Sequence, residues 1–168
     1  MAEIERQRMT LTLQQALSIA QRTLADGAQN GFLPLAVAVL DIAGQPLAIL
    51  RDERTSLHRA DIAVGKAAGC LAMGFGGREL AKRAAAMPQF ISAVGSIFPK
   101  GLVPVPGGVL IRDASGLLLG AVGVSGDTSD NDEVCAIAGI AAAGLVASHR
   151  LRGRSWPRRH GICASGRR

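Results

Sequence analysis

Two stretches of the sequence follow one pattern, and this pattern constrains the fold more than any other feature. Each has an apolar run, an Asp-x-x-Gly turn and a second apolar run: VAVLDIAGQPLAIL is the first and VLIRDASGLLLGAV the second. Aliphatic runs on either side of a glycine-containing turn are typical of antiparallel hairpins. We therefore predict strands over residues 35–41 and 46–51 in the first hairpin and over 108–112 and 117–124 in the second. The shared turn reflects common turn chemistry rather than a duplication.

Helical patterns precede, separate and follow the hairpins. The first begins with Thr12 and Gln15, the spacing of a capping box, and continues with apolar residues at helical intervals. Acidic residues gather in the first turn of the last pattern, where the helix dipole favours them. The four predicted helices cover residues 12–31, 58–75, 78–87 and 129–149.

The predicted order αββααββα is that of an α+β domain, in which the hairpins form one antiparallel sheet covered by helices. Residues 89–106 contain Pro99, Pro104 and Pro106 and show no period, so we expect a long loop with functional potential. The chain has 168 residues, the length of one domain, and 48% hydrophobic residues are enough for a single core.

The apolar runs of the sequence are too short for a membrane helix, which needs roughly 20 residues. The start, MAEIERQRMT, has no apolar signal core. We therefore expect a cytoplasmic protein without a membrane partner.

The net charge of +6 comes from the end of the chain. Residues 1–147 hold 12 Lys and Arg against 13 Asp and Glu, whereas the segment from Ser148 onwards adds seven arginines and no acid. We predict a folded domain over residues 1–147 and a basic, disordered tail over 148–168. Nucleic-acid binding is expected at most through this tail, because the rest of the chain offers few aromatic residues for stacking bases.

The three cysteines do not form a motif. Cys70, Cys135 and Cys163 are an odd number and contain no C-x-x-C pair, which excludes a zinc ribbon and argues against a disulfide framework. Cys70 and Cys135 lie among alanine and glycine in helical patterns, where cysteine usually acts as a small buried hydrophobe. We do not expect a catalytic cysteine.

Two glycine-rich turns are candidates for ligand binding. Gly107 and Gly108 form one, and Ser125 and Gly126 form the other, just before a predicted helix. Backbone N–H groups that no side chain covers, next to a helix amino terminus, suit an anion such as a carboxylate. The alternative is that these glycines only allow the chain to turn.

Cationic residues cluster between the first hairpin and the following helix: Arg51, Arg54, His58, Arg59 and Lys66. Lys66 lies on an otherwise apolar helix, so we expect it to meet a carboxylate from Asp61, from the acid-rich turn or from a ligand. Lys66 and His58 are also the candidate catalytic residues, with Arg51 holding a substrate carboxylate.

His58 has three possible roles. It could be an axial ligand of haem, a general base, or a surface residue at the start of a helix. It is the one histidine of residues 1–147.

The acidic residues Asp127, Asp130, Asp132 and Glu133 could bind a hard cation through oxygen. Their spacing does not fit an EF-hand, and capping and the helix dipole already explain them, so we predict no metal site. The neighbouring GVSGD lacks the second spacer of a serine nucleophile elbow.

Taken together, the first helix and the segments VAVLDIAGQPLAILR, ADIAVGKAAG, PVPGGVLIRDASGLLLGAVGVSG and DNDEVCAIAG resemble the GlcG/HbpS family over roughly residues 10–146. That family includes haem-binding proteins and the carboxy-terminal domain of some cobalamin adenosyltransferases. The resemblance implies a five-stranded antiparallel sheet flanked by helices in a profilin-like layout. It also implies assembly into dimers or larger rings.

The resemblance implies a binding protein for haem, another tetrapyrrole or an organic anion. The alternative is an enzyme, a lyase, isomerase or hydrolase, acting on a small carboxylic acid in organic-acid or aromatic catabolism. Gln45 stands where some relatives place a histidine, and AMGFGGRELAK replaces a threonine-bearing helix pattern. Both departures weigh against a histidine-ligated haem.

We also expect a homo-oligomer. The last predicted helix carries Ala138, Ala142 and Gly144 along nearly one stripe. The chain also has more small and aliphatic side chains than one face of a sheet can cover. Exposed apolar surface of this kind favours symmetric self-association. We expect ligand loops near the subunit boundaries.

Overall fold

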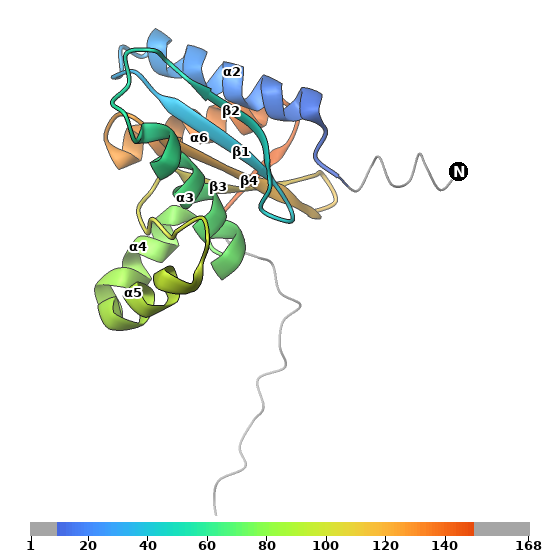
Figure 1. Cartoon of the computed structure of the whole chain (residues 1–168). Coiled ribbons are helices and arrows are strands. Elements are labelled where there is room, and N and C mark those ends of the chain that lie inside the picture. The colour runs from blue at the N-terminus through green and yellow to red at the C-terminus, as the bar shows by residue number, and fades with distance from the viewer. Residues whose placement is uncertain (1–9, 150–168) are drawn as a thin grey trace, which may run out of the picture.

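A five-stranded antiparallel sheet forms the centre of the protein (Figure 1). The structure is a computed structural model and describes residues 10–149. Its strand order is β2-β1-β4-β3-β5, so β2 and β5 are the edge strands. The strands are β1 (Ala36–Asp41), β2 (Pro46–Arg51), β3 (Gly108–Arg112), β4 (Leu118–Ser125) and β5 (Val146–Ser148). The predicted α+β class with a five-stranded antiparallel sheet is confirmed.

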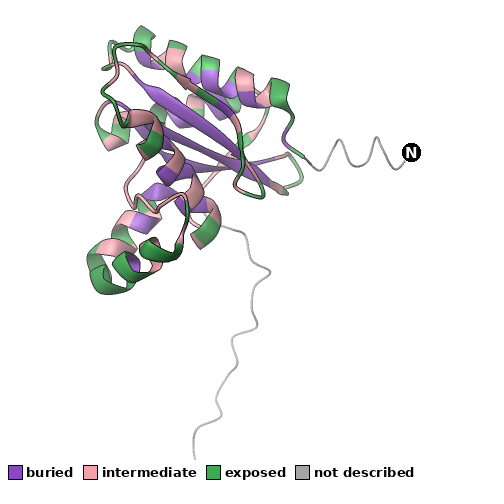
Figure 2. Cartoon of the chain, viewed as in Figure 1, coloured by how far each residue is buried: buried purple, intermediate pink, exposed green. Residues whose placement is uncertain are grey.

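Helices cover both faces of this sheet. α2 and α6 pack together on one face, and α3 lies on the other face over β4, β1 and β3, with α4 beside it (Figure 1). Because both faces are covered, the central strands are buried along nearly their whole length (Figure 2). The helices are α2 (Leu13–Gln29), α3 (Arg59–Met73), α4 (Gly77–Ala86), α5 (Pro88–Ile97) and α6 (Ser129–Ala142).

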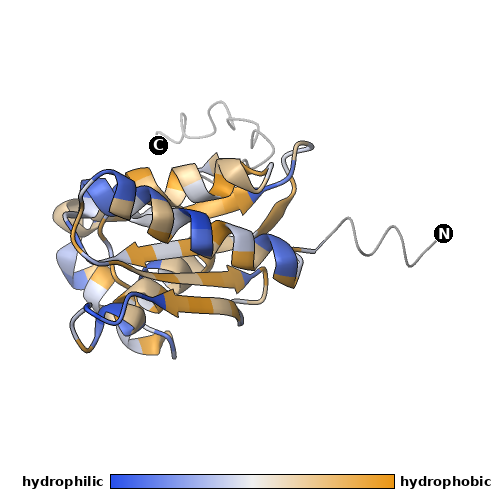
Figure 3. Cartoon of the chain, turned by 90° about the horizontal axis from the view of Figure 1, so that it is seen from above, coloured by the Kyte–Doolittle hydropathy of each residue, from blue (hydrophilic) through white to orange (hydrophobic). Residues whose placement is uncertain are grey.

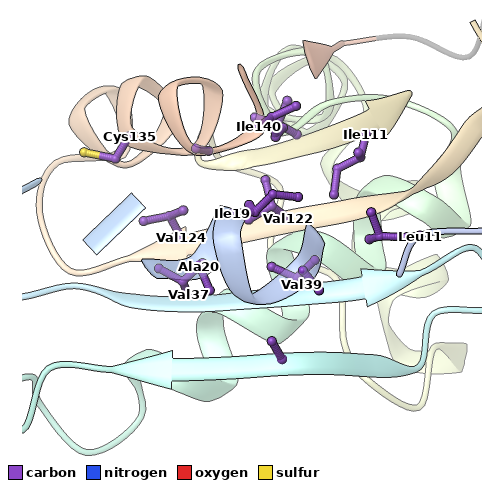
Figure 4. Packing of buried hydrophobic residues seen from close by; sticks show 14 of the residues in the cluster. Leu11, Ile19, Ala20, Val37, Val39, Ile111, Val122, Val124, Cys135 and Ile140 are labelled. Carbon is purple, nitrogen blue, oxygen red and sulfur yellow. The ribbon is translucent and has the colours of Figure 1, made fainter. Parts of the chain in front are cut away.

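Alternate residues of each strand supply the two halves of the core. Val37 and Val39 of β1 and Val122 and Val124 of β4 point toward α2 and α6, where Ile19 meets them (Figure 4). A smaller cluster on the α3 face contains residues from strands and helices: Leu40, Ala67, Cys70, Leu80, Leu110 and Ala121. Apolar residues therefore concentrate in the strands and in the inner faces of the helices, as Figure 3 shows.

Both hairpin turns use their aspartate in the same way. The Asp41 carboxylate accepts a hydrogen bond from the Gln45 backbone N–H, and the Asp113 carboxylate accepts from the N–H groups of Ser115 and Leu117. Gly44 and Gly116 adopt positive φ angles of 75° and 90°. Glycine is favoured at such angles, so the Asp-x-x-Gly pattern follows from turn chemistry.

The predicted start of α2 is confirmed in detail. The Thr12 hydroxyl accepts a hydrogen bond from the Gln15 N–H, and the Gln15 side chain accepts from the Thr12 N–H. This reciprocal pair satisfies two backbone donors that the first helical turn leaves without partners.

The predicted long loop over residues 89–106 is wrong in its first half. Pro88 ends α4 but also begins α5, because proline has the right φ angle for the first turn of a helix and no N–H that would need a partner there. α5 buries only Ile91, although Phe90, Val94 and Ile97 follow the i, i+4, i+7 spacing of a helix. The three prolines that indicated a loop all lie beyond the end of α5 at Ile97. Figure 2 shows α5 as largely exposed.

The last predicted helix is too long. α6 ends at Ala142, and the residues expected to continue it form β5, which pairs with β3. Gly144 stops the helix with a φ of 71°, and the Leu145 N–H bonds back to the Ile140 carbonyl, the hydrogen-bond pattern of a Schellman motif. The predicted basic tail lies outside the described residues apart from Ser148 and His149.

Cys70 and Cys135 are free, buried thiols, as predicted for small hydrophobes. Burial raises the pKa of the Cys70 thiol to about 12, which keeps it protonated and unreactive at neutral pH. Cys163 lies outside the described residues. Across residues 10–149, no helix combines the length and the hydropathy that a membrane span requires.

The backbone of helix α3 packs directly against Gly123 of β4. A Cβ atom at this position would collide with the Ala63 carbonyl oxygen, and the Ala67 backbone nitrogen would be 2.9 Å away. Backbone atoms cannot turn aside as a flexible side chain can. Gly123 therefore sets the distance between helix and sheet.

We predict that Gly123→Ala destabilises the fold by about 1–3 kcal/mol or more, the usual cost of overpacking a core. Gly95→Ala in α5 is the matched control, because its Cβ would make an ordinary contact, 3.6 Å from Leu102 Cβ. Urea unfolding of both variants measures the difference. Equal stability of the two variants would contradict the proposed role of Gly123.

Candidate functional site

A buried ion pair joins α3 to the start of α6. Lys66 Nζ donates to Asp132 Oδ2 over 2.8 Å, and the two side chains are 3% and 1% exposed. Asp132 Oδ1 also accepts a hydrogen bond from the Asp127 backbone N–H. Of the three partners expected for Lys66, the structure thus selects the acid-rich turn.

Burial raises the pKa of the Asp132 carboxyl above its usual range, and its hydrogen bond and charge interaction with Lys66 oppose that rise. Removing water disfavours a lone charge, whereas a close opposite charge favours it. Removing either member of the pair would therefore leave the other as an unpaired charge inside the protein.

Gly107 closes over this pair, and Gly108 packs against α3 beside it. A Cβ on Gly107 would be 2.8 Å from Lys66 Nζ and 2.9 Å from Asp132 Cβ, and the residue has a φ of 105°. A Cβ on Gly108 would be 2.6 Å from Cys70 Sγ. The first glycine turn therefore packs against protein atoms, which supports the structural alternative for these residues.

The second predicted turn is also enclosed. Ser125 is fully buried, and its hydroxyl accepts a hydrogen bond from Arg59 Nη1 over 3.2 Å. A Cβ at Gly126 would collide with the Pro34 carbonyl oxygen. The structure thus brings Lys66 and the predicted glycine and serine residues to the same end of the sheet, in a packed interior.

Arg51 and His58 lie on the surface at that end of the sheet. Arg51 pairs in register with Ala36 of β1, which pairs in turn with Ser125 of β4. His58 precedes the first residue of α3, and its side chain is 74% exposed. The predicted site residues therefore separate into a buried group and an exposed group.

The His58 ring contacts a carboxylate in the first turn of α3. His58 Nδ1 lies 3.1 Å from Asp61 Oδ2. A proton on Nδ1 can donate to this carboxylate, which leaves the lone pair of Nε2 available. Carboxylates orient metal-bound histidines in proteins in this way.

Sequence reasoning missed a second group of charges beside α4. Arg78 donates two hydrogen bonds to Glu133 Oε2, over 2.8 and 2.6 Å, and one to Asp130. His149 Nδ1 lies 3.7 Å from the other Glu133 oxygen. Asp130 and Glu133 are three residues apart on one helix face, so their spacing is a signal that could have indicated a shared cation.

A cavity of about 350 Å³ also escaped prediction. It lies between the turn from β1 to β2, the second half of α3 and residues 98–100. Residues 98–100 follow α5, which the sequence did not reveal, so this wall could not be placed in advance. In the described part of the chain, no cluster of three or more His, Cys, Asp or Glu side chains is arranged to hold a metal ion.

The sequence model of the family described as haem degrading protein HbpS-like matches residues 11–141 of this chain. The chain belongs to the HbpS-like family. The predicted resemblance is thereby confirmed. No curated protein sequence matches the chain.

Solved structures agree with this membership. A crystal structure of HbpS is 30% identical, with a TM-score of 0.68, and the match covers 79% of this chain and 89% of that one. A double mutant of Streptomyces reticuli HbpS is 31% identical, with the same TM-score and coverage of 79% and 86%. A complex of PduOC with haem has a TM-score of 0.71 at 23% identity, with coverage of 81% and 96%, and supports the fold alone.

We predict that Lys66→Met destabilises this HbpS-like protein by about 3–5 kcal/mol, because it leaves Asp132 buried without its counter-charge. The double variant Lys66→Met/Asp132→Asn should lose much less, because it buries no charge and keeps an acceptor for the Asp127 N–H. Urea unfolding at pH 7 measures both. A double variant no more stable than the single variant would show that the charge pair is not the stabilising feature.

Proposed function

We propose that this protein binds haem at its surface, with His58 Nε2 as an axial ligand of the iron. Membership in the HbpS-like family supports haem-related binding. The two departures that weigh against a histidine-ligated haem, at Gln45 and over residues 72–82, do not include His58. The observation that carries the proposal for this site is the contact between His58 Nδ1 and Asp61. This contact suits the ring tautomer that presents Nε2 to a metal, and histidine is a common axial ligand of haem iron.

The surroundings of His58 suit the rest of a haem molecule. Leu57, the preceding residue, is 83% exposed, and Ile49 on the edge strand β2 is also exposed. These side chains offer apolar contact for a porphyrin ring. Arg51, two residues beyond Ile49, can pair with a propionate, and arginine suits carboxylate recognition through its planar donors.

The enzyme alternative has weaker support. It requires Lys66 or His58 to transfer a proton to or from a substrate, and Lys66 is buried and bound to Asp132. A general base must reach the proton that it removes. We therefore place binding before catalysis as the function of this surface.

We predict that hemin added to the wild-type protein produces a saturable shift of the Soret band, and that His58→Ala weakens this binding by at least about tenfold, as loss of an axial ligand should. Asp61→Asn should weaken it less than His58→Ala does, because only the orientation of the ring is affected and Nε2 is kept.

His149→Gln is the matched control for that titration, because His149 contacts Glu133 rather than the His58 surface. Its hemin affinity should equal that of the wild type. Unchanged hemin affinity in His58→Ala would show that His58 is not the ligand. The absence of any saturable shift in the wild type would show that the protein does not bind haem.

We also propose that the protein self-associates through the outer face of α6. Val134 and Ile137 are exposed there, beside the alanines of the predicted stripe. Large apolar side chains next to small residues allow two such helices to approach closely and to bury apolar surface.

We predict that Val134→Glu reduces the molar mass measured by light scattering to that of a smaller species, because the carboxylate would have to be desolvated in the contact. A chain that ends after His149 keeps the hydrogen bond from the Gly76 N–H to the His149 carbonyl and should retain the assembly. A monomeric wild type, or loss of the oligomer only on truncation, would contradict the proposal.

A further inference from the structure

Lys100 holds its ammonium group against neutral oxygens. Nζ donates to the Gly44 carbonyl over 2.8 Å and to Gln45 Oε1 over 3.0 Å. Both acceptors belong to the turn between β1 and β2. Among residues 10–149, no carboxylate forms an ion pair with this lysine.

This arrangement leaves the lysine with unused binding capacity. An ammonium group has three N–H donors, and two of them are occupied. No neighbouring carboxylate of the described residues compensates its positive charge. A charge close to apolar surface is stabilised by a counter-ion, so an anion that binds here would be favoured. The Gln45 amide nitrogen stands beside the ammonium group as a further donor group.

The ammonium lies at the wall of the cavity of about 350 Å³. Most of the other lining is apolar, with Ile42, Leu71 and Phe98 as its larger side chains. The volume is within the range of small-molecule sites, which combine apolar walls with a few polar groups that fix the ligand's orientation.

We infer that this cavity binds a small organic carboxylate whose body is apolar, with the carboxylate on Lys100 and Gln45 and the apolar body against Leu71 and Phe98. A compact inorganic anion such as phosphate would gain nothing from the apolar walls. A neutral apolar molecule would leave the charge of Lys100 without a partner.

The site is separate from the proposed haem surface. The α3 residues that line the cavity are Ala68, Leu71 and Ala72. They lie 10–14 residues beyond His58, which is roughly 15–20 Å along a helix. The two sites can therefore be tested independently: His58→Ala should leave carboxylate binding at this cavity unchanged.

The test compares 3-phenylpropionate with its neutral amide, 3-phenylpropanamide, by titration calorimetry. In the wild type, the carboxylate should bind at least about tenfold more tightly, the usual size of a hydrogen bond to a charged partner. In methyl NMR spectra of the full chain, its addition should shift the signals of Ile42 and Leu71.

Lys100→Met should abolish the preference for the carboxylate, whereas Lys82→Met, at an exposed lysine on α4, should retain it. Lys100→Gln is a second neutral variant that keeps an amide donor toward the turn, and it decides the matter if Lys100→Met unfolds. A preference that survives in the folded Lys100 variant, equal binding of the two compounds by the wild type, or no shift at Ile42 and Leu71 would overturn the inference.

Discussion

The buried contact between Lys66 and Asp132 determines how the two halves of the chain meet. It joins the helix after the first hairpin to the helix after the second, across the sheet that the hairpins form. Charges so deeply enclosed require each other, because either one alone would be strongly destabilising. Gly107 has no side chain, and this absence lets the loop before β3 close over the pair. A lysine, an aspartate and a glycine thus form one structural unit.

This unit has a consequence for function. Protein atoms fill the space around Lys66 in the middle of α3. A ligand can therefore be bound only by groups that reach the surface or a cavity. His58 at the beginning of α3 and the Lys100 cavity beside its second half are such groups. One offers an oriented imidazole to a metal, and the other offers a cation to a carboxylate. Both border the same helix, which contacts α6 through Lys66 and packs against Gly123 of β4.

Sequence reasoning succeeded where a residue's role is local or strongly constrained. The hairpins follow from their turns and the start of α2 from its capping box. The cost of an unpaired buried charge indicated that Lys66 would meet a carboxylate, but it left three sources open. Sequence reasoning failed at α5, because the prolines after Ile97 were given more weight than the helical spacing of the apolar residues before them, and at β5, whose three residues become a strand only by pairing with β3. The Lys100 cavity could not be predicted because α5 positions one of its walls. The glycines of the turns at 107–108 and 125–126 could not show from sequence alone whether these turns face a ligand or pack against other parts of the protein.

The most direct test of this account is a crystal structure of the protein with ferric haem. The account predicts an iron atom bonded to His58 Nε2, the porphyrin against Leu57 and Ile49, and the contact between Lys66 and Asp132 retained at about its present 2.8 Å. Haem bound away from His58, or inserted between Gly107 and Lys66 with the ion pair broken, would contradict it.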